Sequence, residues 1–125
     1  HLKRYFDGLF ANFPVTSAQG LLLDYLFHNQ SRDVFQKDLE EYLEIKSSSV
    51  TSILDNLEKN GYVRRESVEY DGRLKKISMT DKAREIEKDI ARRVSEYMHS
   101  LFRDIPERDR EVFYFVMCRM IENAQ

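Results

Sequence analysis

The chain has 125 residues, of which 42% are hydrophobic and 34% charged, and a formal net charge of −2. This composition supports one packed domain, and 12% aromatic residues exclude a disordered chain. Four glycines and two prolines argue against an all-β fold, and the apolar runs are too short to span a membrane. No leader is visible after His1, so we expect a cytoplasmic protein.

Cysteine and histidine usage bears on redox and metal chemistry. The single Cys118 excludes an internal disulfide and a cysteine zinc site, and we expect it to be a small buried hydrophobe rather than a redox sensor. His1, His28 and His99 lack the spacing of metal ligands. We therefore predict no metal and no cofactor.

The charge is unevenly distributed along the chain. Residues 45–84 hold nine basic and six acidic residues, a net +3, which leaves −5 for the remainder. A net charge of −2 disfavours a nucleic-acid partner, but this asymmetry marks a basic segment that the average conceals.

The first third of the chain has helical signals. Apolar residues at steps of three and four predict a helix over 1–13, which Pro14 ends. Thr16 and Gln19 have the spacing of a capping box and begin a helix that reaches about Asn29. Asp33, with Gln36 three residues later, is predicted to cap the next helix.

Two short helices then follow at helix-turn-helix spacing. Residues 44–46 separate the helix that begins near Asp33 from one that Ser47 is predicted to cap. Asn60-Gly61 ends this second helix, because glycine accepts the left-handed conformation at a helix C-terminus. The predicted buried face of the second helix carries Val50, Ile53, Leu54 and Leu57.

The pattern changes after Gly61. Residues 62–70 and 73–79 read as two strands, and Asp71-Gly72 is a strong signal for a two-residue hairpin turn. Thr80 is the predicted N-cap of a long helix, and Pro106 precedes a last helix over about 107–123. That last helix is too apolar around its circumference for an ordinary surface helix.

Two segments carry a family resemblance. Residues 47–65, with Leu57-Glu58, Gly61, Val63 and Arg65, and the segment from Asp71-Gly72-Arg73 to Ser78-Met79-Thr80 resemble the recognition helix and wing of the multiple antibiotic resistance regulator (MarR) family of bacterial winged-helix transcription factors. The resemblance implies a mostly α fold with a small β-hairpin wing. It implies a winged helix-turn-helix over 16–80, with the helix-turn-helix at 33–60 and the wing at 62–79. Dimerisation helices at 1–13 and 81–125 would flank this domain.

The family also implies a function, namely a homodimeric, sequence-specific regulator of double-stranded DNA, usually a repressor, at a palindromic operator. A recognition helix buries one face and presents small or polar side chains to the major groove. An asparagine there can read adenine bidentately. The candidate recognition residues are Ser47, Ser48, Ser49, Thr51, Ser52 and Asn56.

The resemblance assigns the wing tip to the minor groove. Arg73 would enter the groove, with Asp71 orienting it and Gly72 allowing a tight turn. The family commonly carries arginine where this chain has Ser52 and Asn56, so more of the affinity is expected from the wing and from phosphate contacts. Four basic residues are equally expected to contact phosphate or to be solvated strand residues, namely Arg64, Arg65, Lys75 and Lys76.

Two further sets of residues follow from the resemblance. The terminal helices carry more apolar surface than one monomer can cover, which predicts a dimer interface with Leu2, Phe6, Leu9, Phe10, Val112, Phe113, Val116 and Met120. Some family members bind a small aromatic or lipid-like effector beside the winged helix. Candidate lining residues are Phe13, Tyr25, His28 and Phe35, although a core or helix-junction role is the more expected one for each.

One alternative remains open at this point. The acidic total and the unusual Ser52 and Asn56 also suit a winged-helix module that contacts protein and not DNA. An enzyme is not expected, because no nucleophile elbow, phosphate loop or metal signature accompanies the serine, histidine and aspartate residues.

Overall fold

The structure is a computed structural model that describes residue 4 and residues 8–125. It divides into two units, residues 1–92 and residues 93–125, each of which is described by itself. Within the described residues, every helix is too short or too polar to cross a membrane.

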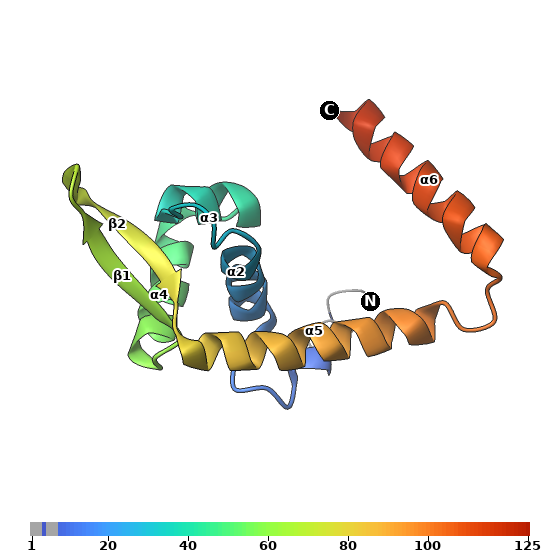
Figure 1. Cartoon of the computed structure of the whole chain (residues 1–125), viewed down its shortest axis with the longest axis horizontal. Coiled ribbons are helices and arrows are strands. Elements are labelled where there is room, and N and C mark those ends of the chain that lie inside the picture. The colour runs from blue at the N-terminus through green and yellow to red at the C-terminus, as the bar shows by residue number, and fades with distance from the viewer. Residues whose placement is uncertain (1–3, 5–7) are drawn as a thin grey trace. The chain divides into compact units, whose positions relative to one another are not determined.

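The observed elements follow the predicted order, and the mostly α fold with one β-hairpin is confirmed (Figure 1). The predicted helix over 1–13 lies largely outside the described residues, within which residues 8–10 are helical. The elements are α2 (Ser17–His28), α3 (Gln36–Leu43), α4 (Ser47–Lys59), β1 (Val63–Val68), β2 (Asp71–Met79), α5 (Asp81–Leu101) and α6 (Glu107–Ala124).

The predicted capping box begins α2. The backbone N–H of Gln19 donates to Thr16 Oγ1 at 3.3 Å, and the backbone N–H of Thr16 donates to Gln19 Oε1 at 2.9 Å. Two backbone donors at the helix start are thereby satisfied by a reciprocal pair of side chains. The helix ends at His28 with Asn29 as C-cap, as the sequence predicted.

The predicted start of α3 at Asp33 is wrong. The helix begins at Gln36, and the backbone N–H of Phe35 donates to Asp38 Oδ2 at 2.8 Å. Residues 34 and 35 are extended because they pair with β2: the N–H of Ile77 donates to Val34 O at 2.8 Å, and Phe35 forms a bridge with Lys76. Pairing across the sheet thus replaces the local cap.

The boundaries of α4 agree with the sequence to within one residue. Lys46 occupies the N-cap position in place of Ser47, which is the first helical residue. Gly61 has a φ of 79°, the left-handed conformation that glycine adopts without steric cost, and it ends the helix as predicted.

The hairpin forms, but its turn differs from the predicted one. Strands β1 and β2 pair antiparallel from Val63↔Met79 to Ser67↔Lys75, and after a register shift Val68 pairs with Asp71. The two-residue turn is therefore at residues 69–70, whereas the sequence predicted Asp71-Gly72. The shift leaves residues 72–74 of β2 without partners at the hairpin tip.

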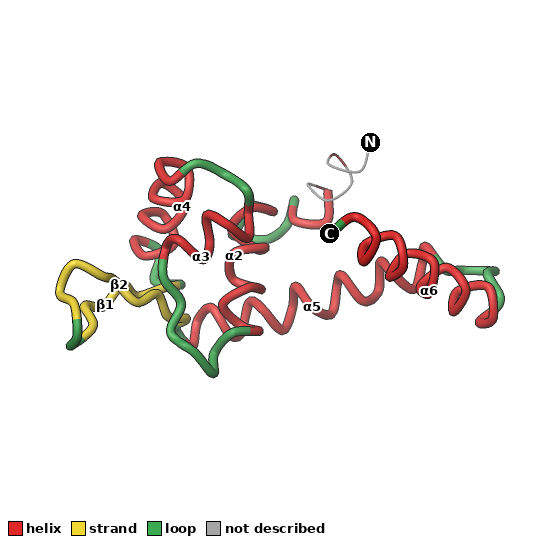
Figure 2. Tube along the Cα trace, turned by 90° about the horizontal axis from the view of Figure 1, so that it is seen from above, coloured by secondary structure: helices red, strands yellow, loops and turns green. Residues whose placement is uncertain are grey.

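The core of the first unit lies between α2, α3, α4, the base of the hairpin and the start of α5. In both views the hairpin projects away from the helices, so its tip is distant from this core (Figures 1 and 2). Side chains that are fully buried include Leu22, Leu23, Leu39, Val50, Leu54, Leu57 and Val63. Three of the four predicted buried residues of α4 are in this core, and Ile53 is half-buried.

The second unit contains the end of α5 and all of α6. None of the described residues of α6 is buried, and its exposed large side chains include Val112, Phe113, Phe115, Val116, Met120 and Ile121. Cys118 is also exposed, so the prediction of a buried thiol is wrong. The reason is that α6 has no core of its own within this unit.

Candidate nucleic-acid interface

Helix α4 presents a row of small polar side chains on its outer side. Ser47, Ser48, Ser49, Ser52 and Asn56 are exposed, as the sequence predicted. Buried Val50, Leu54 and Leu57 hold the opposite side against the core. Short hydroxyls permit a backbone to approach a partner closely and to bond polar groups there.

Thr51 is placed differently from its predicted neighbours. It is half-buried, its hydroxyl donates to Ser47 O at 2.9 Å, and its Oγ1 accepts from Gln36 Nε2 at 2.8 Å. The Gln36 amide on α3 also lies 3.2 Å from the carbonyl and the hydroxyl oxygens of Ser47. Thr51 therefore joins α4 to α3 and does not stand on the outer face.

Asn56 is exposed, and its side chain is tied to another helix. Gln19 Nε2 on α2 donates to Asn56 Oδ1 at 2.7 Å, and Asn60 Nδ2 donates to the same oxygen at 3.2 Å. Because Oδ1 is already bonded within the chain, the bidentate adenine contact expected for Asn56 is not available in this arrangement.

Arg65 of β1 binds two carboxylates of α4. Its Nη2 lies 2.6 Å from Asp55 Oδ1, its Nε lies 3.2 Å from Glu58 Oε2, and its side chain is 24% exposed. The hydrogen bond from Arg65 holds the pKa of Glu58 below its usual value, and the two acceptors raise the pKa of Arg65. Arg65 therefore attaches the wing to α4.

The wing tip carries an oriented cation. Asp71 Oδ1 accepts from the backbone N–H of Arg73 at 2.9 Å and from its Nε at 3.3 Å. The side chain of Arg73 is nevertheless 93% exposed. A fixed, solvated guanidinium at the end of a projecting hairpin suits insertion into a narrow, negative groove.

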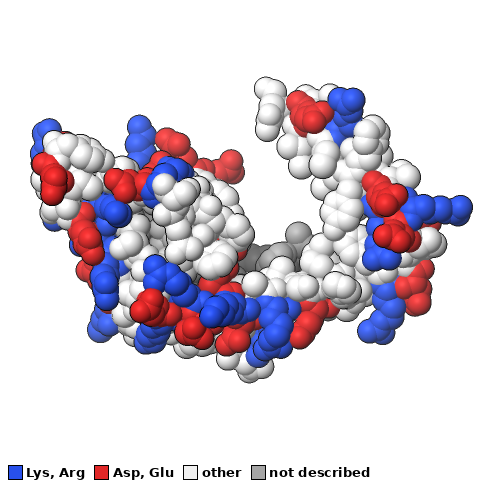
Figure 3. Space-filling view, in the orientation of Figure 1, with Lys and Arg blue, Asp and Glu red and all other residues white. Residues whose placement is uncertain are grey.

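Three other basic residues lie along the hairpin. Lys75 Nζ donates to Ser67 Oγ at 2.7 Å, and Lys76 Nζ lies 3.2 Å from Asp33 Oδ1. Arg64 is exposed, and no described residue forms an ion pair with it. Basic and acidic side chains alternate over the hairpin and the visible side of α5 (Figure 3), so the positive charge is local to the wing tip and to Arg64.

Gln19 and Gln36 are the site residues that sequence reasoning missed. Their contacts with α4 join residues 37 and 15 positions apart, respectively. The capping-box spacing identified Gln19 as a structural residue, but it gave no signal for the second contact. That contact appears only when α2 packs beside α4.

The four predicted effector residues do not line one cavity. Tyr25 stacks on Tyr42 with ring centroids 4.5 Å apart, and His28 Nδ1 lies 3.3 Å from Asp24 Oδ1 on the surface. Phe35 is half-buried beside β2. Phe13 lines a separate cavity, formed by residues 10 and 13–17, which the other three do not reach.

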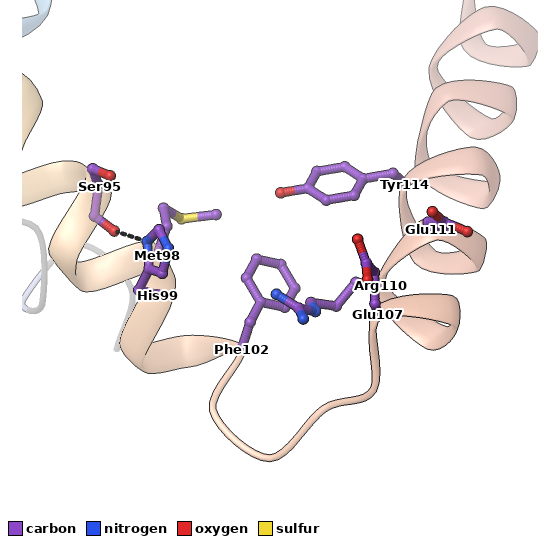
Figure 4. A pocket seen from close by; sticks show the side chains of 8 residues that line it. All are labelled: Ser95, Met98, His99, Phe102, Glu107, Arg110, Glu111 and Tyr114. Carbon is purple, nitrogen blue, oxygen red and sulfur yellow. Dashed lines mark hydrogen bonds between the residues drawn. The ribbon is translucent and has the colours of Figure 1, made fainter.

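A different cavity, of about 470 Å³, lies within the second unit, where α5 ends and α6 begins (Figure 4). Met98, Phe102 and Tyr114 form its apolar walls, and Arg110 lies among them beside Glu107 and Glu111. Arg110 Nε is buried without a hydrogen-bond partner among the described residues. Sequence reasoning did not select this cavity.

The predicted dimer residues fall into three groups. Leu2 and Phe6 lie outside the described residues. Leu9 is half-buried, and Phe10 is buried against Gly20 of its own chain. On α6, four predicted residues are exposed, namely Val112, Phe113, Val116 and Met120.

Comparisons with known proteins agree with this architecture. A family model described as the MarR family matches residues 13–74. The Bacillus subtilis protein named "Uncharacterized HTH-type transcriptional regulator YdgJ" is 28% identical over 102 residues, which is 82% of this chain and 61% of that relative. This chain therefore spans about three fifths of the length of that relative.

Solved structures share the whole fold. A MarR transcriptional regulator from Methanosarcina mazei Go1 is 26% identical with a TM-score of 0.82, covering 98% of this chain and 86% of that one. A Staphylococcus aureus MepR–DNA complex has a TM-score of 0.83 at 24% identity, covering 99% of this chain and 90% of that one. Together with the family match, these likenesses show that the chain belongs to the MarR family and has the winged-helix fold of its solved members.

Proposed function

We propose that this chain forms a homodimer that binds double-stranded DNA and regulates transcription, with α4 in the major groove and Arg73 in the minor groove. The named relatives are transcription regulators and not enzymes, and one solved neighbour is described as a DNA complex. The observation that carries the proposal is the pairing of an exposed polar face on α4 with the oriented, solvated Arg73 at the wing tip.

The dimer is part of this proposal because one winged helix reads only a short half-site. Two recognition helices about one DNA turn apart require two-fold symmetry. The apolar side chains of α6 support a self-complementary interface, since a stripe of that kind is costly to leave in water. Repression follows when such a dimer occupies an operator.

Selection of bound sequences from a random duplex pool tests DNA recognition and symmetry together. We expect a palindromic consensus whose half-sites lie about 10 base pairs apart. A reporter gene placed behind that consensus then tests repression, with lower expression expected when the protein is present. A pool that yields no enriched sequence would contradict the proposal.

A second function has one observation in its favour. The chain has a net charge of −2, and its α4 carries serine and asparagine at residues 52 and 56, so few long cationic side chains face outwards. A winged-helix module that contacts protein would have the same features. An unenriched duplex pool, with the α6-mediated dimer intact, would favour this second function.

A further inference from the structure

The side-chain oxygen of Asn56 has no acceptor position left for a ligand. A carbonyl oxygen has two lone pairs. Gln19 Nε2 donates to Asn56 Oδ1 at 2.7 Å and Asn60 Nδ2 donates to it at 3.2 Å. Both positions are therefore used inside the chain, although Asn56 itself lies on the exposed side of α4.

The capping box of α2 sets the orientation of the Gln19 amide. The backbone N–H of Thr16 donates to Gln19 Oε1 at 2.9 Å, so Oε1 faces Thr16 and Nε2 faces α4. The opposite orientation would place Nε2 against the N–H of Thr16 and lose both hydrogen bonds. Amide orientation is decided by such networks, and here only one orientation satisfies every partner.

The orientation of Gln19 in turn determines that of Asn56. Because Gln19 offers a donor, Asn56 must turn its oxygen inwards and its Nδ2 outwards. No described residue accepts a hydrogen bond from Asn56 Nδ2, so both of its hydrogens remain for an external acceptor. A cap at the start of α2 thereby decides which atoms α4 presents.

We propose that Asn56 reads DNA bases only as a hydrogen-bond donor through Nδ2, and that Gln19 is the positioning residue that imposes this. The inference rests on the proposed DNA-binding function. In the major groove guanine presents two adjacent acceptors, O6 and N7, whereas adenine pairs its N7 acceptor with an N6 donor. Asn56 should therefore favour guanine over adenine at the base it contacts.

The substitution Gln19→Glu tests the orientation without removing the cap. Glutamate at this position also completes a capping box, because its carboxylate accepts from the N–H of Thr16. A carboxylate cannot donate, so Asn56 should reverse its amide and turn Oδ1 outwards. Asn60 Nδ2 keeps its 2.8 Å hydrogen bond to the backbone oxygen of Asn56, which preserves the end of α4.

Selection from a random duplex pool with the full chain gives the readout. We expect one position per half-site to prefer guanine with the wild type and to shift by about fivefold or more towards adenine or cytosine, which offer donors, with Gln19→Glu. Gln30→Glu is the matched control, since it adds the same charge at a residue that contacts Phe27 and Arg84 and not α4. That control should keep the wild-type consensus.

Three results would overturn the inference, and they are distinguishable. A wild-type palindrome that Gln19→Glu leaves unchanged overturns the donor-only reading and leaves the proposed function intact. A wild type that selects no sequence overturns both. In the free protein, side-chain amide hydrogen exchange by NMR should show Gln19 Nε2 protected and Asn56 Nδ2 unprotected, and the reverse would overturn the orientation itself.

Discussion

Arg65 on β1 and Glu58 on α4 form a hydrogen-bonded ion pair that joins the wing to the proposed recognition helix, with Arg65 Nε 3.2 Å from Glu58 Oε2. The neighbouring Arg64 lies on the other face of the same strand and is exposed. Two consecutive arginines thus have different roles, one structural and one available to a partner.

Replacing these two arginines separately should separate stability from binding. Arg65→Ala leaves Asp55 and Glu58 without their shared cation, so we expect the free energy of unfolding to fall by about 1 kcal/mol. Arg64→Ala should leave thermal stability unchanged and reduce affinity for the selected duplex, with a shallower dependence on salt. Thermal denaturation and duplex titration measure the two effects, and equal loss of stability in both variants would contradict this division.

Arg73→Ala should weaken duplex binding by about 1–3 kcal/mol and reduce the salt dependence by about one counterion. The reason is that Arg73 is held by Asp71 yet almost fully solvated, so its loss removes a binding group without disturbing the fold. Titrations of the selected duplex at two salt concentrations provide the measurement. Arg103→Ala removes the same charge from the second unit and serves as the control. Unchanged affinity for the Arg73 variant would refute the wing-tip assignment.

Glu87 predicts a loss of stability as pH rises. Its side chain is 2% exposed, and burial, together with a hydrogen bond and charge repulsion from Asp24, raises its pKa to about 8. The folded chain therefore keeps a proton that the unfolded chain releases at about pH 4.5. Stability should be greatest below that pH, fall as pH rises towards 8, and then level off, a loss on the order of 2–4 kcal/mol.

Denaturant unfolding at a series of pH values measures this loss. Glu87→Gln keeps a neutral side chain of the same shape at every pH, so its stability should be nearly constant over the same range. Glu85→Gln changes an exposed residue of the same helix, which pairs with Lys88, and should retain the wild-type profile. A wild-type profile that is flat between pH 5 and 8.5 would show that Glu87 is ionised in the folded chain.

Gly20 on α2 should not tolerate alanine. A Cβ at this residue would lie 2.8 Å from Phe10 Cζ and closer still to Cε1, and the Phe10 ring is itself buried. Overpacking of this kind costs about 1–3 kcal/mol, which exceeds the gain of roughly 1 kcal/mol from replacing glycine in a helix. The free energy of unfolding of Gly20→Ala measures the cost.

Two companion variants make this prediction specific. Gly8→Ala introduces a Cβ with no atom within 4 Å and should not destabilise the chain. Adding Phe10→Leu to Gly20→Ala should recover part of the loss, because a smaller side chain vacates the ring position. Equal stability of the two alanine variants would contradict the close packing of Phe10 on Gly20.

A charge placed on α6 should dissociate the proposed dimer. Val116→Glu inserts an unpaired carboxylate among the exposed apolar side chains of that helix, and burying it against a second copy is unfavourable. We expect the dimer dissociation constant to rise by about tenfold or more in sedimentation experiments. Glu122→Gln, a small change at the polar end of α6, should leave the dimer unaltered. A Val116→Glu variant that remains dimeric would place the interface elsewhere.

Much of this architecture was determined by short-range sequence patterns. The capping box at Thr16 and Gln19, the left-handed Gly61 and the apolar face of α4 were all predicted correctly, because each depends on residues within one or two helical turns. The two faces of α4 also separated as predicted, apart from Thr51. The family resemblance added the role expected of each face.

Only the tertiary structure decided the remaining features, because they depend on residues far apart in the sequence. Pairing of residues 34–35 with β2 moved the start of α3, and the register shift at the hairpin tip moved its turn. Packing of α2 beside α4 brought Gln19 to Asn56 and thereby set which atoms of the amide face outwards. Hydrophobic period and spacing determined which residues form the helix that would enter DNA, whereas contacts between separate elements determined the hydrogen-bonding groups that the helix presents.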